Sequence, residues 1–201
     1  KSAVILAGLN SYGNTTIEEN VKSRDHTENL LKKNNKAIKI KKGKKKIIKI
    51  FGKKNLDNFN INVSGDPSSA AFFTALTLLN SNSSIKIKNV GLNPTRIGFY
   101  KILMKQRAKI KFVNLKKENN EISGDILVKS SKLKPIKTEA SMYPSTTDEY
   151  LLLFLIAGLQ NGESVFKGIA DLANKESSRA LEMKKILNQI GIKCELKKMR
   201  W

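Results

Sequence analysis

The fold of this chain is decided by the stretch SGDPSSAAFF (residues 64–73), which continues to GLNPTR (residues 91–96). Asp66 followed by Pro67 predicts a helix start, because aspartate caps helix N-termini and proline fits the first helical position. Residues 70–79 are apolar nearly all round, which predicts that this helix is buried.

The next residues predict a strand, a turn and a second helix. Apolar and polar residues alternate over 84–90, as in a half-exposed strand. Asn93-Pro94 resembles Asp66-Pro67 and predicts a second helix that opens in the same way. A strand at 109–113 follows that helix. The order is therefore helix, strand, turn, helix, strand.

The same order occurs twice more along the chain. Upstream, the expected elements are a helix at 2–9, a strand at 15–17, a turn at 23–27, a helix at 28–33 and a strand at 37–40. Downstream, they are a helix at 150–159, a strand at 163–167, a turn at 174–179, a helix at 180–190 and a strand at 192–196. The period of about 70 to 85 residues is too long for a solenoid and indicates a small α/β unit used three times.

The net charge of +21 would ordinarily indicate a nucleic-acid-binding surface. However, 33 of the 38 basic residues are lysines spread along every segment, without the aromatic interleaving of single-strand binders. Their densest run, 41–49, predicts a hairpin that turns at Gly43. We interpret the lysines as solvated faces and expect no nucleic acid as partner; attraction of anionic small substrates is the alternative.

Length and composition set further bounds. A chain of 201 residues can hold one or two domains, and no apolar run reaches the length of a membrane span. The single cysteine, Cys194, allows no internal disulfide and is expected to be a small core residue on the last strand, with a nucleophile as the alternative. We expect a cytoplasmic protein without membrane contact. The chain begins inside an expected helix, which predicts an internal fragment of a longer protein.

Arginine is scarce, yet Arg24, Arg96 and Arg179 occupy the same place in each repeat, near the start of the second helix. A cation at that position opposes the helix dipole. An anion bound at the helix N-termini would remove the conflict, because backbone N–H groups and a guanidinium would converge on it. The alternative is that arginine braces the loop through backbone carbonyls, which the NPTR turn favours for Arg96.

Two carboxylates join these arginines as candidates. Thr146 and Glu149 fit a capping box, which leaves Asp148 either as a dipole-favourable acid or as an active carboxylate. Glu176 lies near Arg179 and has the same two interpretations. His26 could join Arg24, although a cap or a simple hydrogen bond is the alternative.

Four motifs in these segments resemble 5-enolpyruvylshikimate-3-phosphate synthases. They are GDPSSAAFF at 65–73, NVGLNPTR at 89–96, SRDHTE at 23–28 and KESxR at 175–179. The resemblance covers the chain up to about residue 196. It implies transfer of the enolpyruvyl group of phosphoenolpyruvate to the 5-hydroxyl of shikimate 3-phosphate, with release of phosphate and without a metal or organic cofactor.

The resemblance also implies a fold of two inside-out α/β barrels, each built of βαβαββ units with buried helices and outer sheets. Residues 1–62 would end the first barrel domain, and residues 63–201 would form two units of the second. The parent protein would be a monomer, and this fragment alone would be inactive.

Site residues follow from the motifs. Asp148 matches the aspartate that accepts the hydroxyl proton, and Glu176 matches the glutamate that transfers protons at the phosphoenolpyruvate methylene. The remaining matches bind substrate: Ser23 and Arg24 at the shikimate 3-phosphate phosphate, Lys175 near the reacting centre and Arg179 at phosphoenolpyruvate. Ser178, Leu151 and Arg107 depart from the family pattern. The alternatives are a UDP-N-acetylglucosamine enolpyruvyl transferase and a basic nucleic-acid-binding module.

Overall fold

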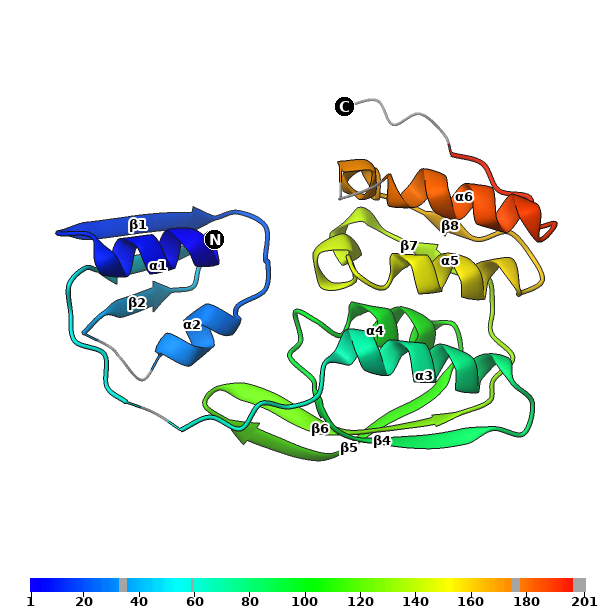
Figure 1. Ribbon diagram of the computed structural model, residues 1–201, viewed down its shortest axis with the longest axis horizontal. Coiled ribbons are helices and arrows are strands. Elements are labelled where there is room, and N and C mark those ends of the chain that lie inside the picture. Colours follow the sequence, from blue (N-terminus) through cyan, green and yellow to red (C-terminus); the bar gives the residue numbers. More distant parts are fainter. Residues whose placement is uncertain (33–35, 59, 175–177, 197–201) are drawn as a thin grey trace.

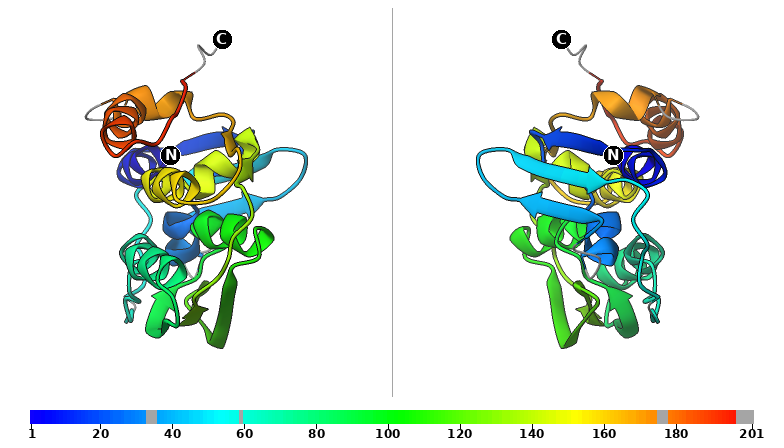
Figure 2. Two further views of the ribbon diagram at one scale, coloured as in Figure 1. Left: turned by 90° about the vertical axis from the view of Figure 1, so that its right-hand side faces the viewer. Right: turned by 90° about the vertical axis from the view of Figure 1, so that its left-hand side faces the viewer.

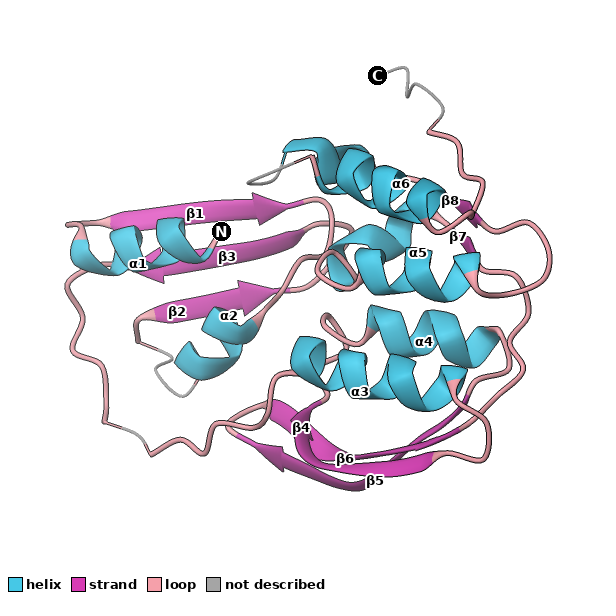
Figure 3. Cartoon of the chain, turned by 45° about the vertical axis from the view of Figure 1, so that its right-hand side comes forward, coloured by secondary structure: helices cyan, strands magenta, loops and turns pink. Residues whose placement is uncertain are grey.

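The computed structural model describes residues 1–32, 36–58, 60–174 and 178–196, which form two lobes (Figure 1). The first lobe contains α1 (Ser2–Asn10), β1 (Asn14–Glu19), α2 (His26–Leu31), β2 (Ile38–Lys41) and β3 (Lys46–Phe51). Its sheet has the order β1-β3-β2 with antiparallel neighbours. Both helices lie on one face of this sheet, where Ile5, Leu31, Ile48 and Ile50 form the core (Figure 3).

The second lobe begins with the same arrangement. It contains α3 (Pro67–Leu79), β4 (Ser84–Gly91), α4 (Gly98–Lys105), β5 (Lys109–Glu118) and β6 (Glu121–Lys129). The sheet order β4-β6-β5 repeats that of the first lobe, again with antiparallel neighbours. The predicted repeat of an α/β unit is therefore confirmed for these two copies.

A third group of elements packs on the helical face of this lobe. It contains β7 (Lys137–Thr138), the 3-10 helix η1 (Ala140–Ser145), α5 (Tyr150–Gly158), β8 (Val165–Phe166), the 3-10 helix η2 (Ala170–Asn174) and α6 (Arg179–Gln189). β7 and β8 are parallel, with α5 between them in the chain. A continuous core includes Ala71 and Ala75 of α3 with Leu153 and Ile156 of α5, so α5 packs against α3.

Local chemistry explains the start of α3. The Oδ2 atom of Asp66 accepts a hydrogen bond from the backbone N–H of Ser69 at 2.9 Å, and Pro67 is the first helical residue. Both parts of the prediction are confirmed. The predicted hairpin around Gly43 is confirmed by the antiparallel pairing of β2 with β3.

Three local predictions are wrong. α4 begins at Gly98 rather than at Asn93, because the Oδ1 atom of Asn93 accepts the backbone N–H of Thr95 at 2.8 Å and closes a separate turn. Residues 192–196 form no strand in the described chain, and Cys194 lies beyond α6 and is half-buried. The apolar helix α3 buries only one face, since Phe72 keeps 63% of its surface exposed.

The helix axes of the two lobes are nearly parallel, so several helices are seen almost end-on in Figure 2. In Figure 1, α1 and α2 begin on the side of the first lobe that faces the second. α3, α5 and α6 begin on the side that faces the first. The N-terminal ends of these helices, with their partial positive charge, are therefore directed toward the region where the lobes meet.

Candidate functional site

Asp148 is the carboxylate on which the two lobes converge. It lies in the turn before α5, and its Oδ2 atom accepts hydrogen bonds from Arg24 Nη2 at 2.6 Å and Arg96 Nη1 at 3.4 Å. Arg24 comes from the loop between β1 and α2 of the first lobe, and Arg96 from the turn between β4 and α4. The structure thus joins a predicted carboxylate with two of the three repeated arginines.

Exposure differs between the two arginines. The side chains of Arg24 and Asp148 are 39% and 37% exposed, whereas that of Arg96 is 14% exposed. An exposed ion pair gives little net stabilisation, about 0–1 kcal/mol, because water solvates both groups well. The Arg24–Asp148 pair can therefore exchange for other partners at small cost.

Arg96 is held on its other side by the start of α3. Its Nη2 atom donates to Asp66 Oδ1 at 2.8 Å and to Ser68 Oγ at 2.9 Å. The interpretation of Arg96 as a brace through backbone carbonyls differs from the structure, in which its guanidinium donates to side-chain oxygens. The guanidinium links the N-terminus of α3 to the turn that carries Asp148.

Glu149 is buried directly beside Asp148, with only 3% of its surface exposed. Its Oε1 atom accepts a hydrogen bond from Ser68 Oγ at 2.5 Å. Burial raises the pKa of Glu149, although the Ser68 hydroxyl and the Arg96 charge act in the opposite direction. The predicted capping box is wrong, because this carboxylate is turned toward α3, and Thr146 Oγ1 has no hydrogen-bond partner within the described residues.

Ser23, the other predicted phosphate contact in the first lobe, is fixed by Glu19. The Oε1 atom of Glu19 accepts both the Ser23 hydroxyl, at 2.5 Å, and the Ser23 backbone N–H, at 3.1 Å. Lys1 and Lys46 pair with the same carboxylate and with the buried Glu28. This partly buried ion cluster determines where the Ser23–Arg24 loop leaves β1.

The ion cluster predicts a pH dependence of stability. Burial opposes the charge of Glu19, but hydrogen bonds from Lys1 and Ser23 and the charges of Lys1 and Lys46 lower its pKa from 4.5 to about 2. The native state therefore binds fewer protons than the unfolded state between these values, and stability present above pH 5 is lost as the pH falls toward 2.

Glu19→Gln should remove this part of the dependence. Urea unfolding at pH 7 and at pH 3 should show a difference in unfolding free energy that is about 2 kcal/mol smaller in the variant than in the parent. Glu18→Gln, which changes an exposed neighbour on the same strand, is the matched control. Equal differences in parent and Glu19→Gln would contradict the assignment.

A second polar cluster joins the lobes, between the start of β6 and the region of α2. Glu121 at the start of β6 accepts hydrogen bonds from Asn29 and Asn93, both at 2.9 Å, and lies 3.0 Å from His26 Nδ1. Asn93 also donates to Asp25 at 2.9 Å. His26 thus takes the simple hydrogen-bonding role, and the cluster fixes the lobes near Arg24. Glu121 was not a sequence candidate, because only the tertiary fold brings it to α2.

The remaining predicted residues are Lys175, Glu176 and Arg179. Lys175 and Glu176 fall outside the described residues, so their predicted roles stay predictions. Arg179 is the first residue of α6 and is half-buried. Its helix begins on the side that faces the first lobe, as α3 and α5 do (Figure 1).

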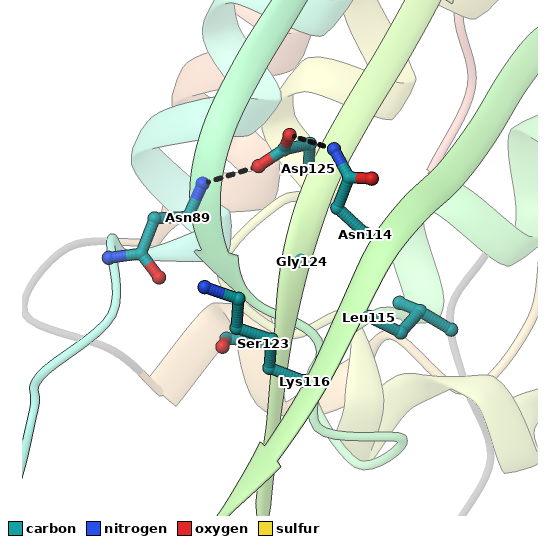
Figure 4. Close-up of a pocket in the computed structure, with 7 residues that line it drawn as sticks. All are labelled: Asn89, Asn114, Leu115, Lys116, Ser123, Gly124 and Asp125. Carbon is teal, nitrogen blue, oxygen red and sulfur yellow. Dashed lines mark hydrogen bonds between the residues drawn. The ribbon is translucent and has the colours of Figure 1, made fainter.

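A hollow of about 460 Å³ lies elsewhere, on the sheet of the second lobe (Figure 4). It arises where the pairing of β6 with β4 and with β5 is irregular, between Ile87 and Val90 and between Val113 and Lys116. Asp125 accepts hydrogen bonds there from the Asn89 backbone and the Asn114 side chain. These bonds stabilise the two bulges, and none of the predicted site residues lines the hollow.

Within the described part of the chain, no group of three His, Cys, Asp or Glu side chains is placed to hold a metal ion. None of the helices described is both long enough and apolar enough to cross a membrane.

The fold and site define an α/β protein in which two lobes bring arginines and a carboxylate together. The family model for EPSP synthase (3-phosphoshikimate 1-carboxyvinyltransferase) matches residues 1–199. The chain belongs to this family.

Curated relatives and solved structures agree with this assignment. The chain is 39% identical over 198 residues to the 3-phosphoshikimate 1-carboxyvinyltransferase of Zymomonas mobilis, covering 98% of this chain and 44% of the relative. The corresponding protein of a Sulfurihydrogenibium species is 40% identical, with 97% and 46% covered. The EPSP synthase structure from Acinetobacter baumannii superimposes with a TM-score of 0.80 at 35% identity, over 92% of this chain and 41% of that one. The chain thus spans less than half the length of these relatives.

Proposed function

We propose that this chain is part of an enzyme that transfers the enolpyruvyl group of phosphoenolpyruvate to the 5-hydroxyl of shikimate 3-phosphate, releasing phosphate. The observation that supports it best is the placement of Asp148 between Arg24 and Arg96, at the junction of the lobes. A carboxylate beside fixed cations, with helix N-termini directed toward it, suits proton transfer on a doubly anionic substrate pair. The family assignment supplies the identity of that pair.

The proposed roles follow the motif matches. Asp148 accepts the proton of the attacking 5-hydroxyl. The hydroxyl oxygen forms a bond to C2 of phosphoenolpyruvate, and Glu176 protonates the methylene carbon. The resulting methyl group then returns a proton to Glu176 as the C2–O bond to phosphate breaks, which restores the double bond and completes the transfer. Lys175 and Arg179 bind substrate beside these carboxylates, and the enzyme uses no metal or organic cofactor.

Arg24 has a defined part in this scheme. In the structure its guanidinium neutralises Asp148 across the lobes. A bound phosphate, contacted by Ser23 and Arg24, would draw the guanidinium away, since Arg binds phosphate through paired N–H donors. Substrate binding would then free the carboxylate that must accept the proton.

The repeated sheets support an inside-out barrel for each lobe, with helices inside and strands outside. On this proposal, residues 1–62 end one barrel domain and residues 63–201 form two units of the next. The protein acts as a monomer in the cytoplasm.

A full-length protein that contains this chain tests the function. Phosphate release should require phosphoenolpyruvate and shikimate 3-phosphate together. Turnover with UDP-N-acetylglucosamine as the only productive acceptor, or a salt-dependent shift of random DNA without turnover, would contradict the proposal.

A further inference from the structure

Arg96 makes contacts that a loop brace does not need. Its guanidinium reaches Asp66 and Ser68 with one nitrogen and Asp148 with the other, so one side chain joins the start of α3 to the turn before α5. Ser68 in turn donates to Glu149, the neighbour of Asp148. The Asp148–Glu149 pair is therefore tied to α3 through both residues.

The two arginines on Asp148 differ in where they come from. Arg24 belongs to the other lobe and is well exposed, whereas Arg96 belongs to the same lobe and is largely buried. Hydrogen bonds to Asp66 and Ser68 at the start of α3 restrict the Arg96 guanidinium. Because the planar group is already held there, it loses little further conformational freedom when it also contacts Asp148. When Arg24 leaves for a substrate phosphate, Arg96 still contacts the carboxylate.

We infer that Arg96 is a positioning residue for Asp148: it keeps this carboxylate oriented and charge-compensated while Arg24 binds substrate. The inference rests on the proposed function and adds a residue to it. Misplacement of a reacting group by about 1 Å can cost 10²-fold in rate, so the tie has kinetic consequences.

Kinetics of the full-length protein test this role. Arg96→Gln should lower kcat by about 10- to 30-fold and change KM for shikimate 3-phosphate by less than about threefold, because the contact acts through Asp148. In an Asp148→Asn background the same change should cost no more than about twofold, since residues that act as a unit are not additive. Arg96→Lys should restore part of the rate, as a point charge can replace one contact but not the fork.

Arg107→Gln, at an exposed arginine after α4, is the matched control and should leave kcat unchanged. A kcat within twofold of the parent in Arg96→Gln, or an equal loss with and without Asp148, would overturn the inference. If Arg96→Gln does not fold, the kcat of Arg96→Lys is compared with and without the Asp148→Asn change. A loss of kcat only when Asp148 is present supports the inference, and an equal loss in both overturns it.

A second readout separates this inference from the proposed function. If the full-length protein turns over neither shikimate 3-phosphate nor UDP-N-acetylglucosamine, the proposed function fails. Crystal structures of the ligand-free full-length protein and of its Arg96→Gln variant then test the positioning of Asp148 alone. Displacement of the Asp148 carboxylate in the variant supports it, and an unchanged carboxylate overturns it.

Discussion

Asp148→Asn should reduce kcat of the full-length protein by about 10³-fold, because it removes the proposed proton acceptor and leaves the shape of the side chain intact. The amide cannot take the hydroxyl proton, and it no longer balances Arg24 and Arg96. The rate of phosphate release at saturating phosphoenolpyruvate and shikimate 3-phosphate measures the effect. Thermal unfolding of the same variant should change little, because the Arg24–Asp148 pair is exposed and Arg96 keeps its contacts with Asp66 and Ser68.

Glu163→Gln is the matched control, since it changes an exposed carboxylate between α5 and β8. Its kcat should equal that of the parent. Normal turnover by Asp148→Asn would remove the proton-acceptor role, while a loss shared by both variants would point to a general charge effect.

Much of the fold could be predicted from local sequence. The starts of α1, α3 and α5 follow from apolar runs, and the Asp66-Pro67 pair fixes where α3 begins. The repeat then follows from the order of the elements. The repeated order fails at 192–196, where it predicts a strand and the described chain has none.

The central strand β6 shows a different limit. The sequence patterns predict no strand at 121–129, although β6 pairs with both neighbours in its sheet. Asn114 and Asn89 adopt positive φ values of 51° and 50° beside it, so the strands change register there. Such irregular pairing depends on partners distant in the chain, and local alternation does not reveal it.

The candidate site was predictable only in part, for the same reason. Ser23, Arg24 and Asp148 were chosen by motif, and the fold brings Arg24 to Asp148 across 124 positions of sequence. Glu19, which fixes Ser23, and Ser68, which contacts Arg96 and Glu149, show no sign of a site role in the sequence. The capping-box pattern predicts a local cap for Glu149, but a local pattern does not contain the hydroxyl of Ser68 on another helix, which donates to this carboxylate.

Gly98→Ala should have the second large effect, on both stability and kcat, because α4 and the turn before Asp148 approach each other at Gly98. A Cβ atom at Gly98 would lie 2.7 Å from the carbonyl oxygen of Ser145 and would also overlap the hydroxyls of Ser145 and Thr146. Thr146 is fully buried, so the turn has no free space to absorb the methyl group. Gly98→Ala must therefore displace either the start of α4 or residues 145–146.

Both displacements should cost stability, by about 1–3 kcal/mol as for other overpacked sites, which chemical denaturation would measure. Movement of the turn also moves Asp148, two residues beyond Thr146, and should lower kcat of the folded fraction by about 10²-fold. Gly43→Ala is the control, since its Cβ would meet only Lys45 O at 3.6 Å in an exposed hairpin. A destabilised Gly98→Ala with full activity per folded molecule would show that this contact supports the fold without placing Asp148.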